Sequence, residues 1–410
     1  MSAAPFRSVR ILLAAFVAAS ALTTWSLAAP DESRAARGME LALQDDATFI
    51  AGSKRVPLQK AFDLVRGIGV SRLRVNLLWA YTMPRSQYNA RRKPATISYS
   101  FDGFDRLVDA AAERGIRIHL SLTGPAPRWA NAKHSLKRAW YKPDTRAFGE
   151  FAGVVADHFE GRVDRYSIWN EANWKTWLGP LKSAPALYRG LYTRGYAAIK
   201  KADRRAKVLI GETAPFARPG MSTAPLAFLR AVTCVNKKYK RSRRCPKLKT
   251  DGYAHHPYDF RHAPNFQYPG ADNVTLGTLS RLTRALDRLS RARVLRSTRG
   301  GRIPLYLTEY GYFASGHRAL PVRKRTRYLQ QAYSIALRNG RVKSQLQYLL
   351  VSPPRRSSSA FFNLALLSTR GKRYPQYGAL QRWFRANRGK VKRPGSAIAL
   401  PSAPPNPVSQ

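Results

Sequence analysis

The sequence alternates between two kinds of segment over most of its 410 residues. Short apolar runs predict β-strands, and longer segments with apolar residues every three or four positions predict helices. The predicted strands are residues 39–43, 72–77, 116–122, 163–169, 207–210, 252–255, 304–308 and 345–351. The predicted helices are residues 58–67, 104–114, 145–159, 186–202, 224–235, 276–289, 322–337 and 377–386. Eight strands, each followed by a helix, predict an α/β protein with a single-domain (β/α)8 TIM barrel.

The N-terminal segment, residues 1–28, has the pattern of a secretory signal peptide. Arg7 and Arg10 precede an apolar run, and small residues at Ser26 and Ala28 offer a cleavage site. The alternative is an uncleaved anchor, because the uncharged stretch nearly suffices to span a bilayer. We favour cleavage, which predicts a secreted, extracellular protein, at most associated with the cell envelope and without stable membrane insertion.

The remaining chain divides into a barrel, residues 29–387, and a tail, residues 388–410. The tail begins with a basic run and continues into Pro-Ser-Ala-Pro-Pro-Asn-Pro. Such a composition offers little apolar surface to bury. It predicts a disordered basic and Pro-rich tail.

The sequence contains two cysteines, Cys234 and Cys245, in a segment rich in Lys and Arg. In an oxidising compartment a pair this close predicts a disulfide, with two free thiols as the alternative. No Cys or His lies at metal-ligand spacing beside them. We therefore expect no metal and no other cofactor.

The formal net charge of the chain is +49. A field of this sign concentrates polyanions, so an anionic polymer at the basic surface is one interpretation. The other is a solvated Arg-rich surface without a specific partner, which we favour because the basic residues are spread along the whole chain. No helix-turn-helix, zinc or base-stacking signature predicts specific nucleic-acid binding. The oligomeric state is not predicted.

Glutamate is scarce, and its placement is informative. Three of the eight glutamates, Glu171, Glu212 and Glu309, fall at the C-terminal ends of predicted strands. Those ends carry the active site in a TIM barrel. Glu171 and Glu309 stand among aromatic residues, on which the apolar faces of sugars stack. Two carboxylates facing each other across a barrel mouth are what glycoside cleavage needs.

The Asn170-Glu171 pair at the fourth strand and Glu309 at the seventh resemble glycoside hydrolase clan A, the cellulase-like retaining (β/α)8 barrels. The resemblance spans nearly the whole mature chain. It implies a glycosidase that cleaves O-glycosidic, chiefly β, bonds of a polysaccharide or glycoconjugate by double displacement. Glu171 is then the general acid/base and Glu309 the nucleophile. The carbohydrate substrate is the expected partner.

The resemblance also implies supporting residues. Asn170 matches the residue that bonds the sugar 2-hydroxyl, and Arg74 matches the arginine that keeps the nucleophile ionised. His256 and Tyr258 resemble groups that contact substrate and nucleophile. His255 should face the other way, because neighbouring strand residues alternate. We add, as expected substrate contacts, Trp129, Trp174, Tyr310 and Glu212, the last to line or brace the site.

The sequence departs from the pattern of this clan at the end of the eighth strand, where many clan members place a Trp beneath the reacting sugar. This chain has Tyr348 in a stretch without Trp. Either Tyr348 replaces that ring or the floor comes from elsewhere. The alternative function is a catalytically silent barrel that binds a carbohydrate or an anionic envelope polymer.

Overall fold

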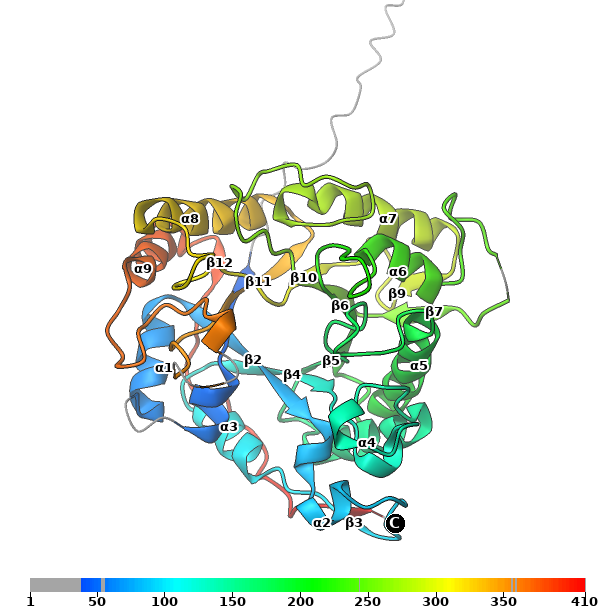
Figure 1. Cartoon of the computed structure of the whole chain (residues 1–410). Helices are drawn as coiled ribbons and strands as arrows, with labels where there is room; N and C mark the ends of the chain where they lie inside the picture. Colours follow the sequence, from blue (N-terminus) through cyan, green and yellow to red (C-terminus); the bar gives the residue numbers. More distant parts are fainter. Residues whose placement is uncertain (1–37, 53–55, 243, 355–356, 358–359, 410) are drawn as a thin grey trace, which may run out of the picture.

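Eight parallel strands form a closed barrel in the computed structural model (Figure 1), which describes residues 38–52, 56–242, 244–354, 357 and 360–409. The barrel strands are β1 (Met39–Gln44), β2 (Val70–Leu78), β4 (Arg117–Thr123), β5 (Arg165–Ile168), β6 (Lys207–Thr213), β8 (Gly252–His255), β10 (Leu305–Leu307) and β11 (Val342–Tyr348). Pairing of β11 with β1 closes the sheet. The predicted (β/α)8 barrel is confirmed. The predicted signal peptide lies outside the described residues.

Helices surround the barrel at the predicted places. They are α1 (Leu58–Gly67), α3 (Asp102–Ala112), α4 (Thr145–His158), α5 (Ala184–Ala202), α6 (Pro225–Val232), α7 (Leu279–Arg291), α8 (Val322–Arg338) and α9 (Pro375–Asn387). Local chemistry sets their starts: Asp144 caps α4 by accepting from two backbone N–H groups, and proline opens α5, α6 and α9. A short α2 (Arg85–Tyr88) lies in the loop after β2.

The apolar core lies between the sheet and the helices, whereas much of the barrel interior is polar. Strand β2 shows the division: Leu73 and Val75 join the apolar core, while Arg72 and Arg74 reach carboxylates across the barrel. Alternation along a strand separates these two sets. Ion pairs therefore occupy much of the interior, and Arg74 belongs to those nearer the C-terminal end.

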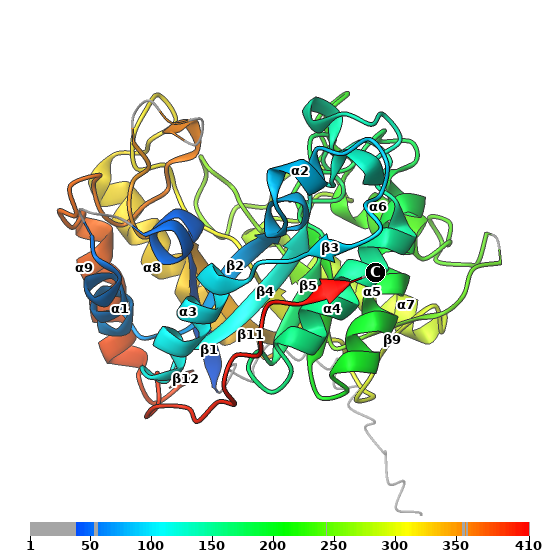
Figure 2. The same ribbon diagram turned by 90° about the horizontal axis from the view of Figure 1, so that it is seen from below.

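The C-terminal tail packs against the barrel, so the prediction of disorder is wrong for residues 388–409 (Figure 2). Strand β12 (Val391–Lys392) adds to β1, and β13 (Val408–Ser409) pairs antiparallel with β3 (Ile97–Ser98). Asn406 bonds the backbone N–H of Phe101 at 2.8 Å. Backbone pairing holds the segment, and composition does not reveal that kind of stabilisation.

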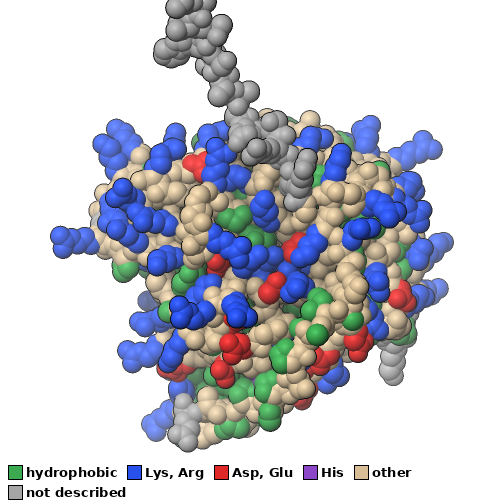
Figure 3. Space-filling model, turned by 180° about the vertical axis from the view of Figure 1, so that it is seen from behind, with side chains coloured by type: hydrophobic (Ala, Val, Ile, Leu, Met, Phe, Trp, Pro, Cys, Tyr) green, Lys and Arg blue, Asp and Glu red, His purple; other side chains and the backbone are tan. Residues whose placement is uncertain are grey.

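Cys234 and Cys245 form the predicted disulfide. It closes the loop after α6, ahead of a parallel pair formed by β7 (Leu248–Thr250) and β9 (Leu295–Ser297). None of the helices in the described ranges is both long enough and apolar enough to cross a membrane. Figure 3, which looks from behind the view of Figure 1, shows Lys and Arg side chains distributed over that face.

Candidate active site

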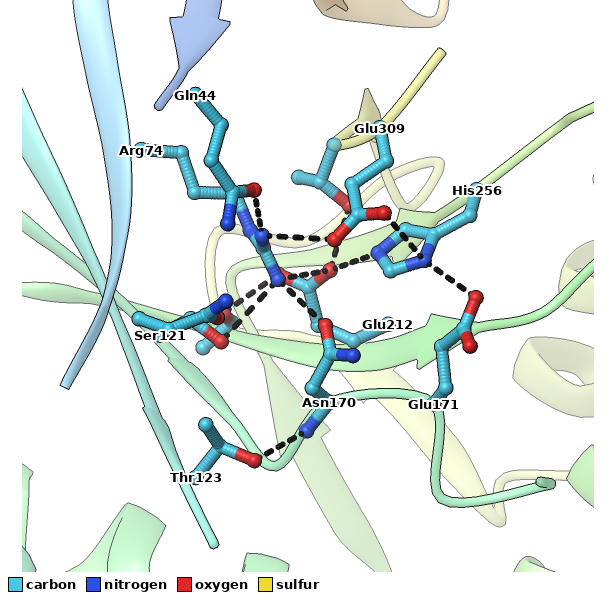
Figure 4. A network of polar contacts seen from close by, with 12 residues as sticks. Gln44, Arg74, Ser121, Thr123, Asn170, Glu171, Glu212, His256 and Glu309 are labelled. Atoms are coloured by element: carbon cyan, nitrogen blue, oxygen red, sulfur yellow. Dashed lines mark hydrogen bonds and ion pairs between the residues drawn. The ribbon is translucent and has the colours of Figure 1, made fainter. Parts of the chain in front are cut away.

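A network of charged side chains occupies the C-terminal end of the barrel (Figure 4). Its members lie in the middle or C-terminal part of β1, β2, β4 and β6, or directly after β5, β8 and β10. Loops that follow the strands rise around this end at the top of Figure 2. The network contains both predicted catalytic carboxylates, Glu171 and Glu309.

Arg74 is the centre of the network and is fully buried. Its guanidinium donates to Glu309 Oε1 at 3.1 Å and to Glu212 Oε2 at 3.2 Å. It also donates to Asn170 Oδ1 at 2.9 Å and to the side-chain oxygen of Gln44. A guanidinium suits this position because it offers five N–H donors in a fixed plane. Arg74 contacts the predicted nucleophile and is itself enclosed by protein atoms.

Glu212 braces the site from below. Its carboxylate accepts bonds from Arg74, His256, Ser167 and Thr308, and the residue has no exposed surface. Burial opposes its ionisation, yet Arg74 and His256 hold the pKa of Glu212 well below the usual range. The expectation that Glu212 braces the site fits this geometry. A direct contact with substrate does not, because the carboxylate is enclosed.

A β-bulge turns Glu212 inward. The register between β6 and β8 shifts at Gly211 and Thr213. Gly211 has φ +118°, and a Cβ there would lie 2.3 Å from the carbonyl oxygen of Ala254. Only glycine fits that position, and bulges of this kind re-aim side chains near active sites.

The backbone is strained where the catalytic groups emerge. Trp169, Glu171 and Glu212 have φ values of 64°, 39° and 48°. Non-glycine residues in this region cost on the order of 1–3 kcal/mol each. The backbone N–H of Glu171 bonds the carbonyl of Glu212 at 2.8 Å, which ties the two turns together. Such strain persists where the surroundings impose it, which is typical of functional sites.

Glu309 is held by two donors. Arg74 binds one carboxylate oxygen, and the hydroxyl of Tyr258 donates to the other at 3.1 Å. Burial raises the pKa of Glu309, against the opposing attraction of His256 and Arg74. Its side chain retains 9% exposure, so a ligand in the cleft can reach it.

His256 links three carboxylates. Its Nδ1 lies 3.0 Å from Glu171 Oε1 and 3.6 Å from Glu309 Oε2, and its Nε2 lies 2.7 Å from Glu212 Oε2. Burial alone would lower the pKa of His256, but Glu309, Glu171 and Glu212 raise it to about 10. The ring is therefore an imidazolium at neutral pH. His255 points elsewhere, as expected, and bonds Thr213 and the carbonyl of Val274.

The two catalytic candidates lie close together. Glu171, His256 and Glu309 each place one polar atom within 4.8 Å of the others. Retaining glycosidases hold their carboxyl groups about 5–5.5 Å apart, whereas inverting ones need about 6.5–9.5 Å. Glu171 is the more exposed partner, with 18% of its side chain accessible.

These three residues also satisfy a simple distance test for a metal site. In this structure His256 and Arg74 already pair with the two carboxylates. A guanidinium 3.1 Å from Glu309 adds a further positive charge where a cation would sit. The arrangement suits proton and carboxylate chemistry.

The predicted aromatic contacts divide into two groups. Trp174 is half-buried beside Glu171, and the backbone N–H of Trp174 donates to the backbone carbonyl of Glu171 at 2.7 Å. Trp129 is half-buried and packs edge-on against Trp79, which indicates at least a structural role. Tyr310 is fully buried, and its hydroxyl bonds Tyr312 at 3.0 Å. Its ring stacks against that of Tyr258 with centroids 6.2 Å apart, and its contact with a substrate stays a prediction.

Tyr348, at the end of β11, is the residue that stands where a Trp was expected. It is half-buried and packs against Phe362 with ring centroids 5.6 Å apart. Its backbone N–H bonds the carbonyl of Tyr310, the residue after Glu309, at 2.9 Å, and burial and the charge of Glu309 raise the pKa of its hydroxyl. This geometry favours Tyr348 over a distant residue as the floor of the site.

The sequence reasoning missed polar residues on the inner faces of the strands. Gln44 joins Arg74 to Asp46, and Ser121 accepts from Arg74 at 3.2 Å. Ser167 donates to Glu212 at 2.6 Å and contacts His119 at 3.0 Å. The sequence pattern could have revealed them, because each is a polar residue at an inward position of an otherwise apolar strand.

A pH dependence follows from this geometry. Because burial raises the pKa of Glu309, the carboxylate is protonated, and so inactive as a nucleophile, at higher pH than an ordinary glutamate. We expect the acid limb of a kcat/KM profile above the usual glutamate range. Tyr258→Phe removes a hydrogen-bond donor to the ionised carboxylate of Glu309, which should move the acid limb to higher pH by about one pH unit. A limb that does not move in the variant would contradict the role of Tyr258.

No protein-family model matches the sequence, and no curated protein matches it significantly. Solved structures are similar. A family 39 glycoside hydrolase from Bacteroides cellulosilyticus superposes with a TM-score of 0.60 at 18% identity, over 85% of this chain and 63% of that one. The chain thus spans less than two thirds of that enzyme.

Two further neighbours are covered more fully. A GH5_18 structure from Streptomyces cattleya, in complex with GlcNAc, has a TM-score of 0.56 at 16% identity, over 88% of this chain and 83% of that one. Xylanase 10B from Thermotoga maritima has a TM-score of 0.52 at 17% identity, over 86% of this chain and 96% of that one. The structural neighbours are clan A glycoside hydrolases, and this chain has their barrel fold.

Proposed function

We propose that this protein is a secreted retaining glycoside hydrolase that cleaves β-O-glycosidic bonds of a polysaccharide or glycoconjugate. The observation that carries the proposal is the placement of Glu171 and Glu309, whose carboxylates approach within 4.8 Å at the C-terminal end of the barrel. So close an approach of one oxygen from each carboxylate favours double displacement, which needs carboxyl groups about 5–5.5 Å apart, over the wider spacing of inverting enzymes. The barrel fold shared with glycosidases supports the same reaction class.

The two carboxylates take different roles because their surroundings differ. Glu309 is oriented by Arg74 and Tyr258, which suits a carboxylate that attacks the anomeric carbon. Glu171 is the more exposed of the two, which suits a group that gives a proton to the leaving oxygen and later takes one from water. The bond from the anomeric carbon to the leaving oxygen breaks as the glycosyl ester with Glu309 forms. Glu171 then takes a proton from the water that hydrolyses this ester.

The test is hydrolysis of aryl β-glycosides and β-glucans by the mature chain, with the product followed by NMR. Release of the β-anomer first supports a retaining reaction, and release of the α-anomer first contradicts it. A folded protein that binds a glycan from the panel without turning it over would instead support the silent binding barrel.

Replacement of Glu171 should separate the two steps. In Glu171→Ala we expect turnover of an unactivated glycan to fall about 10²–10⁴-fold, because the leaving oxygen receives no proton. An aryl glycoside with an acidic phenol needs no such proton, so it should give a burst of phenol and then stall at the glycosyl ester. Stopped-flow absorbance measures the burst. Equal losses on both substrates, without a burst, would contradict the assignment.

A further inference from the structure

A cavity lies at the end of the barrel opposite to Glu171 and Glu309, where the strands begin. It has a volume of about 410 Å³. Its basic lining residues come from five strand starts or adjoining loops and from the tail; they are Arg165, Lys207, Arg299, Arg302, Lys343 and Lys392. Its acidic lining residues are Glu40 and Asp251. We call this cavity the basal pocket; Lys and Arg side chains are numerous on the face of the molecule that Figure 3 shows.

The two acidic residues are already engaged. Glu40 accepts from Arg72 at 2.9 Å and from Arg165 at 2.7 Å, and Lys392 lies 3.7 Å away. Although burial opposes ionisation, Arg165 and Arg72 hold the pKa of Glu40 well below its usual range. Asp251 pairs with Lys200 at 2.9 Å, from outside the lining. Both carboxylates of the lining are thus engaged, and the described residues give no ion pair to Lys207, Arg299 or Lys343.

Arg165 gives the pocket a rigid wall. It is 3% exposed, and its guanidinium lies over the ring of Tyr306 at 4.4 Å from the centroid. Its Nε is buried without a hydrogen-bond partner among the described residues. A buried donor without a partner costs free energy.

The cations also repel one another. Lys207 and Arg299 form no ion pair within the part of the chain that the structure describes. Burial, and then the charges of Arg165 and Arg299, lower the pKa of Lys207. Spreading these charges over the surface would avoid this cost, so their convergence on one cavity favours a bound anion.

We propose that the basal pocket binds a phosphate-bearing anion. A phosphoryl group brings a charge of about −1.5 to −2 and three strong acceptor oxygens, which matches several converging cations better than a single carboxylate does. Arginine recognises such groups through paired N–H donors. Because the pocket is opposite Glu171 and Glu309, a phosphate-containing polymer held there would leave the catalytic end open. The proposal does not depend on catalysis.

The experiment compares the mature protein with Lys207→Gln/Arg299→Gln at constant ionic strength. Binding of inorganic phosphate and of a poly(glycerol phosphate) is measured by calorimetry, with citrate as the carboxylate control. We expect at least about tenfold weaker binding by the double variant, since two charge-assisted contacts are lost. Lys137→Gln/Arg138→Gln removes the same charge from exposed positions elsewhere and should bind as the unmodified protein does.

The outcomes separate the ligand sources. Pocket-dependent binding of phosphate alone identifies a free phosphate or monoester, and pocket-dependent binding of the polymer identifies a phosphodiester. Binding that is equal in all three proteins, or citrate binding as tight as phosphate binding, would overturn the proposal. Without ligand, the pocket variant should have a higher Tm because repulsion is relieved, whereas a purely structural role of these cations predicts a lower one.

Discussion

Glu309→Gln is expected to lower kcat by roughly 10⁴–10⁶-fold, as loss of a catalytic nucleophile does in other covalent mechanisms. The amide has nearly the shape of the carboxylate, so Arg74 and Tyr258 keep a partner of similar size. It cannot form the glycosyl ester, and both steps of double displacement are lost. Initial rates on the best substrate of the panel, with circular dichroism to verify folding, measure the effect.

The control is Glu150→Gln, which removes a carboxylate from an exposed ion pair with Lys93. It should change kcat less than about twofold, because exposed pairs contribute little. A loss in Glu309→Gln no greater than in this control would contradict the nucleophile assignment.

Azide distinguishes the two carboxylates. In Glu309→Ala the anion can occupy the vacated space and attack the anomeric carbon, which gives a glycosyl azide of inverted configuration. In Glu171→Ala azide instead attacks the glycosyl ester, and the configuration is retained. If the two products are exchanged, the roles of Glu171 and Glu309 are reversed.

The sequence was sufficient to predict the barrel and its reactive end because both depend on local patterns. Strand and helix periods fix the order of elements, and parallel strands bring their C-terminal ends to one edge. Glu171 and Glu309 could therefore be placed near each other although 138 residues apart in sequence.

Contacts that depend on strand rotation could not be predicted in the same way. The bulge at Gly211 encloses Glu212 beneath the site, and amino-acid composition does not predict a bulge. Tyr310 directly follows the nucleophile candidate, yet its ring is fully buried and its hydroxyl bonds Tyr312. The tail was misjudged because its order comes from backbone pairing with β1 and β3, which leaves no apolar pattern.

Arg74→Met should affect both stability and chemistry. Arg74 is fully buried and pairs with Glu212 and Glu309, so its removal leaves each carboxylate with one of its two cations, His256. Breaking a buried ion pair from one side costs about 3–5 kcal/mol. The pKa of Glu309 should rise further, because a neighbouring positive charge is lost. We expect kcat/KM at neutral pH to fall roughly 10²–10³-fold, and the acid limb to move to higher pH.

The matched control is Arg72→Met, two residues earlier on the same face of β2. Arg72 is equally buried and pairs with Glu40 and Asp164, but at the other end of the barrel. Its loss should lower the free energy of unfolding while activity per folded molecule and the pH profile stay unchanged. Denaturant unfolding and pH-dependent kinetics of both variants decide the matter. If both lose activity only in proportion to their unfolded fraction, Arg74 is a structural cation; if only Arg74→Met shifts the acid limb, Arg74 keeps the nucleophile ionised.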